Sequence, residues 1–163
     1  MEYKVITKNF GSEVSELIKN AKKTIDVCVF DWRWYGKNPE NSVQLFNMSV
    51  SRACSRGVKV RALVNNDDIL NNLRKIGVDS RKFISKYLLH TKLIIIDGET
   101  VITGSHNYTQ SAFCANYELS VILTGLPAFS EFSEFFNNLW QGQEAIAVKG
   151  YTGERFKFNP RKQ

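Results

Sequence analysis

The two histidines of the chain, His90 and His106, are the residues whose type points first to catalysis. His90 stands two residues before Lys92 in an apolar run that we predict to be one strand, Tyr87–Ile96. Alternate residues of a strand project to the same side, so the imidazole and the ammonium group should lie together. A neighbouring ammonium group favours the neutral form of an imidazole, which is the nucleophile. An exposed edge strand with two solvated polar residues would show the same pattern, so this segment alone leaves catalysis open.

A second polar segment, from Gly104 to Asn107, follows the next expected strand. A glycine at a strand end lets the backbone approach a ligand closely. Ser105 and Asn107 offer a hydroxyl and an amide, which are suitable donors to phosphate oxygens. Glu118 follows in another expected strand, where its carboxylate could hydrogen-bond one imidazole nitrogen and leave the other free to attack. Singly, these features are equally typical of a turn and of a solvated strand residue.

The elements that must position these side chains alternate along the chain. Period-two patterning predicts strands over Glu2–Thr7, Thr24–Phe30, Val58–Val64, about Val78–Ile84, Tyr87–Ile96, Thr100–Thr103 and Tyr117–Leu123. Helical spacing predicts a helix from a Ser12 cap to about Lys22, one over about 41–56 and one from about Asp67 to Gly77. A fourth helix is opened by Pro127. Its apolar stripe comprises Phe129, Phe132, Phe136, Leu139 and Trp140. This alternation favours an α/β sandwich with a mixed sheet.

Taken together, the two polar segments resemble the signature of the phospholipase D superfamily. The signature is H-x-K-x4-D followed by G-S-x-N, and the matching residues are His90, Lys92, Asp97, Gly104, Ser105 and Asn107. Glu118 falls where the family often carries a glutamate. The single motif and the length of 163 residues are similar to the small bacterial endonuclease branch. The resemblance implies an α/β/α sandwich around a central mixed sheet.

The resemblance also implies a mechanism. One histidine attacks a phosphodiester to form a phosphohistidine, and a second histidine protonates the leaving oxygen and then activates water. Because this chain has one motif, a homodimer is expected in which two copies of His90 share one active site across an isologous interface. His106 could instead be the second histidine, but it would point away from Ser105 and Asn107 if the segment is extended. A loop conformation would weaken that argument.

The matched residues take separate roles under this resemblance. The expected catalytic residues are His90, Lys92 and Glu118, with Glu118 holding His90. The residues expected to bind the phosphate are Lys92, Ser105 and Asn107. Asp97 and Gly104 are expected to be structural, and Asp97 also suits the hairpin turn Asp97-Gly98 on local grounds.

We expect no metal ion and no other cofactor. Two histidines, no paired-cysteine motif and no clustered carboxylates make a zinc or two-magnesium site hard to build. Cys28, Cys54 and Cys114 are too widely spaced for a disulfide framework or a zinc motif.

The charge of the chain bears on its partners. The net charge is +6, and a basic domain commonly meets phosphate polyanions. We expect one domain over residues 1–163 with a basic tail from about 143; a second basic cluster comprises Arg74, Lys75, Arg81, Lys82 and Lys86. Trp32, Arg33 and Trp34 interleave aromatic and basic residues and could contact nucleic acid. The tryptophans could equally pack in the core or in a dimer seam.

These observations favour a nuclease acting on DNA or RNA as a homodimer. A lipid hydrolase, such as one that cleaves cardiolipin, and a non-catalytic nucleic-acid-binding module are the alternatives. The N-terminus shows no signal-peptide pattern, so a cytoplasmic protein is expected. No apolar run approaches the roughly 20 residues of a membrane helix, and no stable membrane association is expected.

Overall fold

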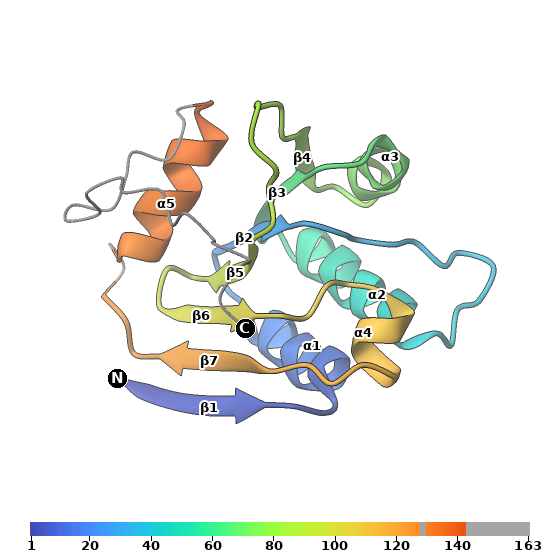
Figure 1. Ribbon diagram of the computed structural model, residues 1–163, viewed down its shortest axis with the longest axis horizontal. Helices are drawn as coiled ribbons and strands as arrows, with labels where there is room; N and C mark the ends of the chain where they lie inside the picture. The colour runs from blue at the N-terminus through green and yellow to red at the C-terminus, as the bar shows by residue number, and fades with distance from the viewer. Residues whose placement is uncertain (128–129, 143–163) are drawn as a thin grey trace, which may run out of the picture.

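One twisted sheet forms the centre of the molecule. The computed structural model describes residues 1–127 and 130–142. The strands are β1 (Glu2–Ile6), β2 (Thr24–Val29), β3 (Lys59–Val64), β4 (Asp79–Lys82), β5 (Lys92–Ile96), β6 (Thr100–Gly104) and β7 (Ser120–Thr124). In the described part of the chain they form one seven-stranded sheet in the order β1-β7-β6-β5-β2-β3-β4 (Figure 1).

Both strand orientations occur in the sheet, as the sequence predicts. β2, β3 and β4 run parallel, whereas the remaining neighbours pair antiparallel. In the central antiparallel pair, Val29 at the end of β2 lies opposite Lys92 at the start of β5. The Phe30 N–H extends this pairing by donating to the Thr91 carbonyl oxygen at 3.0 Å. The residues just after β2 therefore lie beside those just before β5.

Helices cover both faces of this sheet. The helices are α1 (Phe10–Asn20), α2 (Ser42–Ser55), α3 (Asp67–Lys75), α4 (Gln110–Cys114) and α5 (Glu131–Trp140). Apolar residues of α1, α2 and α3 share one buried cluster with Ile25, Val27 and Ile94 of the central strands. Phe136 and Leu139 of α5 belong to the other cluster, on the opposite face. The predicted α/β/α sandwich is confirmed.

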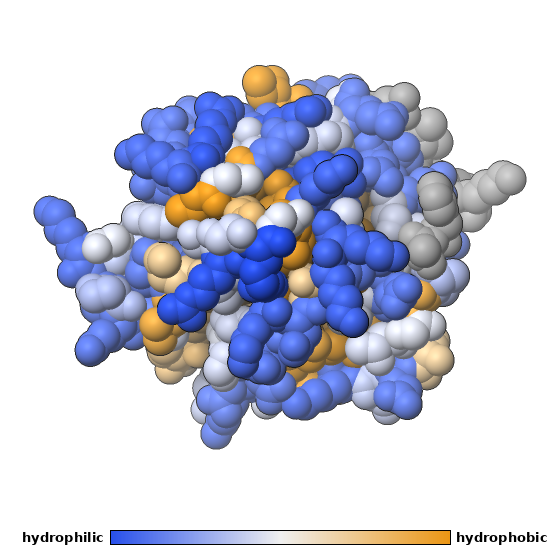
Figure 2. Space-filling view, turned by 180° about the vertical axis from the view of Figure 1, so that it is seen from behind, coloured by the Kyte–Doolittle hydropathy of each residue, from blue (hydrophilic) through white to orange (hydrophobic). Residues whose placement is uncertain are grey.

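The face of the molecule that lies behind the view of Figure 1 is mostly polar. Figure 2, viewed from behind Figure 1, shows hydrophilic side chains over most of that face, with hydrophobic residues visible between them. No helix in the described ranges has both the length and the apolar character needed to cross a membrane.

Several predicted boundaries are wrong. The last helix, predicted to be opened by Pro127, begins at Glu131. The strand predicted over Tyr87–Ile96 begins only at Lys92, because the apolar residues before His90 pair with no strand in the described structure. Tyr87 and Leu88 are exposed, whereas Leu89 is buried. The strand predicted from Tyr117 begins at Ser120. The first helix begins at Phe10, whose side chain is buried, and not after a Ser12 cap.

Two sequence predictions lie outside the described residues. They are the place of Phe129 in the apolar stripe and the basic tail from about residue 143.

Asp97 ties the β5–β6 hairpin to the loop between α1 and β2. Its carboxylate accepts the backbone N–H groups of Lys22, Lys23 and Thr24 at 2.9, 2.7 and 2.9 Å. Burial acts to raise the pKa of Asp97, but these three bonds and the charge of Lys23 outweigh it, so the pKa lies below its usual value. Asp97 itself has a positive φ of 54° in the turn. Asp97 therefore has a structural role and not a role in proton transfer.

Replacing Asp97 with alanine should lower the free energy of unfolding by about 1–3 kcal/mol at pH 7, because three N–H groups lose a charged acceptor. Asp97→Asn should cost less, since asparagine keeps one acceptor oxygen and tolerates positive φ. The lowered pKa means that the advantage of aspartate over asparagine is complete above about pH 5 and is lost as the pH falls below about 4, through the folded-state pKa. Urea unfolding of the wild type, Asp97→Ala and Asp97→Asn, at pH 7 and at a pH below the folded-state pKa of Asp97, measures these differences. Equal stability of the wild type and Asp97→Ala at pH 7 would contradict the assignment.

Candidate active site

His90 lies in the segment that leads into β5, where β2 ends. Its imidazole is exposed, and it contacts the Phe30 ring with the ring centroids 4.9 Å apart. The Lys92 Nζ atom lies 3.3 Å from His90 Nδ1 and 3.4 Å from Nε2. The two side chains lie together as their spacing predicts, although His90 precedes the strand.

Lys92 is a buried cation. Its side chain points from β5 to the face that carries α1 and is only 8% exposed. The ammonium group donates to the His90 carbonyl oxygen at 2.8 Å, and it forms no salt bridge with any carboxylate that the structure describes. Burial lowers the pKa of Lys92, and the charge of Glu118 opposes that change. A buried ammonium without a contacting carboxylate is costly unless an anion binds beside it.

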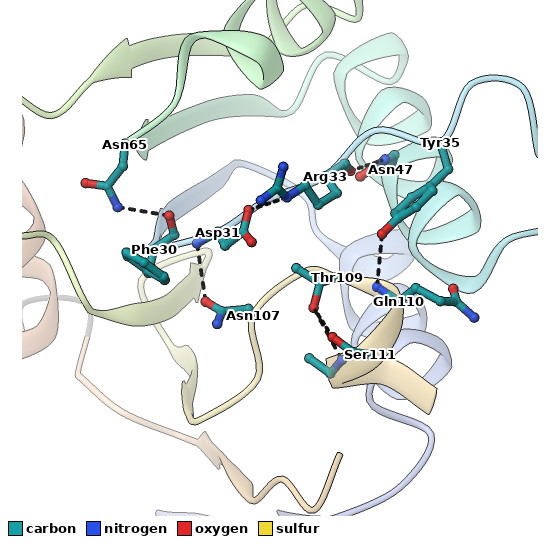
Figure 3. A network of polar contacts seen from close by, with 11 residues as sticks. Phe30, Asp31, Arg33, Tyr35, Asn47, Asn65, Asn107, Thr109, Gln110 and Ser111 are labelled. Atoms are coloured by element: carbon teal, nitrogen blue, oxygen red, sulfur yellow. Dashed lines mark hydrogen bonds and ion pairs between the residues drawn. The ribbon is translucent and has the colours of Figure 1, made fainter. Parts of the chain in front are cut away.

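A close crossing of two backbone segments positions the second half of the motif. A Cβ atom on Gly104 would collide with the Leu119 carbonyl oxygen and the Ser120 Cα atom, so only glycine fits there. Further along, the Asn107 Oδ1 atom accepts the Asp31 N–H at 3.2 Å (Figure 3). The Asn107 Nδ2 group donates to no other residue in the described ranges, so it remains a donor for a ligand.

Glu118 contacts Ser105 and not His90. The Ser105 hydroxyl donates to Glu118 Oε2, and Asn116 Nδ2 donates to Oε1 at 3.0 Å. Burial acts to raise the pKa of Glu118, but these two bonds and the charges of His106 and Lys92 lower it overall. The expected hydrogen bond from Glu118 to His90 does not occur between these two described residues. The reason is that Glu118 precedes β7 and its carboxylate is already engaged.

His106 is part of the core. It is 2% exposed, its Nδ1 lies 2.8 Å from Ser120 Oγ, and its ring stacks on Phe10 with the centroids 4.2 Å apart. Burial lowers the pKa of His106, although the charge of Glu118 opposes this. Within one copy of the chain, His106 is therefore too enclosed to act as the second histidine.

Two residues that sequence reasoning missed position His90. Asn65, just after β3, donates from Nδ2 to the carbonyl oxygens of Phe30 and Leu89, both at 2.9 Å. It thereby joins the end of β2 to the residue before His90 (Figure 3). The Phe30 ring packs against His90 and lies 5.3 Å from Lys92 Nζ. A polar residue at the carboxyl end of a buried parallel strand is the signal that could have identified Asn65.

One expected nucleic-acid contact in the loop after β2 is wrong. Trp32 is 1% exposed, and its indole N–H donates to Asn47 Oδ1 at 2.7 Å, so it belongs to the core and cannot reach a ligand. Arg33 is exposed and pairs with Asp31 at 2.7 Å, and Trp34 is half-buried. The alternative of core packing therefore holds for Trp32, and Trp34 packs partly against the same core.

Three members of the second basic cluster make contacts within the chain although they are exposed. Arg81 lies 3.8 Å from the centre of the Trp140 ring, and Lys82 pairs with Asp67 at 2.6 Å. Arg74 donates to the Ser80 carbonyl oxygen at 3.2 Å. Residues 1–127 and 130–142 contain no group of three histidine, cysteine or acidic residues that could hold a metal ion.

Comparison with known proteins places this geometry in a family. The family described as a cardiolipin synthase, PLD-like domain, matches residues 14–140. The chain is 30% identical over 141 residues to a mitochondrial cardiolipin hydrolase from Xenopus tropicalis, covering 83% of this chain and 63% of the relative. It is 27% identical over 135 residues to the mitochondrial cardiolipin hydrolase of Chlamydomonas reinhardtii, covering 79% and 56%. The chain thus spans less than two thirds of the length of these relatives.

A solved structure shares the fold. Nuc from Salmonella typhimurium, a phospholipase D family member, matches with a TM-score of 0.71 at 23% identity, over 90% of this chain and all of Nuc. Because the family match covers most of the chain and includes both polar segments of the motif, the protein belongs to the phospholipase D superfamily.

Proposed function

We propose that the protein is a metal-independent phosphodiesterase that cleaves DNA or RNA through a phosphohistidine at His90, in an active site shared by two copies of the chain. The observation that carries the proposal is the exposed His90 imidazole beside the buried Lys92 ammonium, which has no carboxylate in contact among the described residues. A phosphate group would supply the missing anion within reach of a nucleophile.

The chemistry proceeds in two displacements. A neutral ring nitrogen of His90 attacks phosphorus, a P–N bond forms, and the bond to the leaving oxygen breaks. His90 of the partner subunit gives its proton to that oxygen. The partner's His90 then takes a proton from water, the water oxygen attacks phosphorus, and the P–N bond breaks to regenerate the first imidazole.

The charge that accumulates on phosphorus needs donors. Lys92 and the Asn107 amide supply positive charge and N–H groups at the site, and Ser105 joins them when its hydroxyl turns from Glu118 to the phosphate. Glu118 holds Ser105 in place and offsets part of the Lys92 charge before the substrate binds.

Two features support the sharing of one site between two copies. One copy exposes a single histidine in its described residues, because His106 is buried. Large apolar residues flank His90 and Glu118 and are exposed to solvent; they are Tyr87, Leu88, Tyr117 and Leu119. Exposed apolar groups of this kind are typical of a surface that a partner covers. A symmetric interface would bring two His90 side chains together there.

A net charge of +6 favours nucleic acid over a neutral partner. The lipid alternative draws support from the two relatives, which are named mitochondrial cardiolipin hydrolases. Both substrates contain the same phosphodiester bond, so the proposed chemistry of His90 serves either one.

Replacing His90 with alanine should lower cleavage by about 10³-fold or more, because the nucleophile is lost. A rapid acid-free quench of the wild type with labelled substrate should trap phosphate on His90, in a bond that is stable to alkali and labile to acid. Peptide mapping after the quench identifies the labelled residue. The variant should keep its helical circular dichroism spectrum. Turnover by His90→Ala, or label on another residue, would refute the nucleophile.

Cleavage should persist in excess EDTA, because no proposed step uses a metal ion. The assay presents plasmid DNA, single-stranded DNA, RNA and cardiolipin vesicles separately, each with and without the chelator. Hydrolysis of a nucleic acid at an unchanged rate supports the proposal. Loss of activity with EDTA, restored by a divalent cation, contradicts metal independence, and cleavage of cardiolipin alone favours the lipid hydrolase.

A further inference from the structure

A groove opens beside the candidate active site, between the loop after β2 and the start of α4. Its volume is about 760 Å³, within the range of roughly 300–1,000 Å³ that small-ligand sites occupy. Arg33, Trp34 and Tyr35 form one wall, and Thr109 and Ser111 contribute hydroxyl groups to the other. Figure 3 shows Arg33 and Tyr35 on one side and Thr109 and Ser111 on the other. The lining is therefore aromatic and cationic on one side and polar on the other.

Asp31 links the groove to the site. It lines the groove and donates its backbone N–H to Asn107 of the motif. Phe30, the preceding residue, contacts His90. Two backbone hydrogen bonds hold the two walls together. The Tyr108 N–H donates to the Asp31 carbonyl oxygen at 2.9 Å, and the Arg33 N–H donates to the Tyr108 carbonyl oxygen at 3.0 Å. The groove therefore adjoins the part of the site that contains Asn107.

Arg33 is set to bind an anion in the groove. Its Nε atom pairs with Asp31 Oδ1 at 2.7 Å, and its side chain is 52% exposed. The terminal guanidinium nitrogens donate to no residue in the described part of the chain. This ion pair keeps Arg33 beside Asp31, while the terminal nitrogens retain the geometry that suits a phosphate.

Trp34 and Tyr35 give the same wall a firmly held aromatic surface. Trp34 is half-buried against the core, and a Cβ atom on Gly36 would lie 2.9 Å from its indole nitrogen, so the loop closes tightly over the ring. The Tyr35 hydroxyl accepts the Gln110 N–H at 3.2 Å, which ties this wall to α4. Ordered aromatic rings beside a cation suit a nucleobase next to its phosphate.

We propose that this groove is a nucleotide subsite that binds the residue next to the scissile phosphate in a single-stranded polynucleotide. Trp34 stacks on the base, and Arg33 binds the adjacent phosphate. A single strand is required, because the bases of a duplex are stacked on one another and do not offer their faces. An acyl chain would meet a guanidinium group and two hydroxyls, which disfavours a lipid tail as the occupant. The inference rests on the proposed function and deepens it.

The test separates stacking from phosphate binding. A labelled single-stranded oligonucleotide is titrated against Trp34→Leu and Arg33→Gln in the His90→Ala background, over a range of salt concentrations. Both changes should weaken binding by about tenfold, since a stacked base and a phosphate contact contribute comparably. Arg33→Gln should also reduce the slope of log Kd against log salt by about 0.7, whereas Trp34→Leu should leave that slope unchanged.

Turnover in the His90-containing protein supplies the second readout. The KM for the oligonucleotide should rise with each variant, while hydrolysis of methyl 4-nitrophenyl phosphate, which has neither base nor second phosphate, should stay unchanged. This small substrate also reports that Trp34→Leu is folded. Tyr3→Leu and Lys4→Gln on the distant edge strand β1 remove an exposed ring and an exposed charge as matched controls, and neither should change binding.

The outcomes distinguish this inference from the function on which it rests. If the oligonucleotide is bound in a Trp34- and Arg33-dependent way but never cleaved, the subsite stands and the nuclease proposal fails. Oligonucleotide affinity that neither variant changes overturns the subsite, whatever the activity. Slower cleavage of cardiolipin vesicles by Trp34→Leu, with unchanged oligonucleotide affinity, also overturns it.

Discussion

The Lys92 ammonium group is buried at the start of the central strand β5, and its hydrogen-bond partners in the described structure all belong to His90. Several parts of the fold maintain this arrangement. The antiparallel register of β2 and β5 brings the end of one strand to the start of the other. Asn65 joins the segment after β2 to the segment before β5 by two hydrogen bonds. The Phe30 ring lies against the side chains of His90 and Lys92. A pre-positioned charge of this kind needs little reorganisation when an anion binds.

The sequence predicts the sandwich and most of the site, for physical reasons that are local. Alternating apolar residues mark β2 and β3, and the Asp97-Gly98 turn marks the hairpin of β5 and β6. The errors arise where tertiary contacts override local pattern. The apolar residues before His90 resemble a strand, yet no neighbouring strand in the described structure pairs with them, and Tyr87 and Leu88 lie exposed. The burial of Trp32 and the Asn65 bridge depend on partners distant in sequence, which no single-sequence pattern specifies.

The expected pairing of Glu118 with His90 illustrates a different limit. Glu118 lies near the site and its charge acts on Lys92, but Ser105 and Asn116 occupy its two oxygens. A motif specifies which residue types gather at a site, whereas the hydrogen bonds among them depend on backbone detail of about one ångström. Family membership likewise indicates the fold and the residue types of the motif, while the surroundings of the site decide which molecule binds there.

Completion of the site by a second copy is the central claim, and mixed assemblies test it most directly. Wild-type and His90→Ala subunits are co-refolded in varied ratios, and activity is measured at constant total protein. If both imidazoles are needed, activity falls as the square of the wild-type fraction, to roughly a quarter in an equal mixture. Activity proportional to the wild-type fraction, or full activity in a species that sediments as a monomer, would contradict the account.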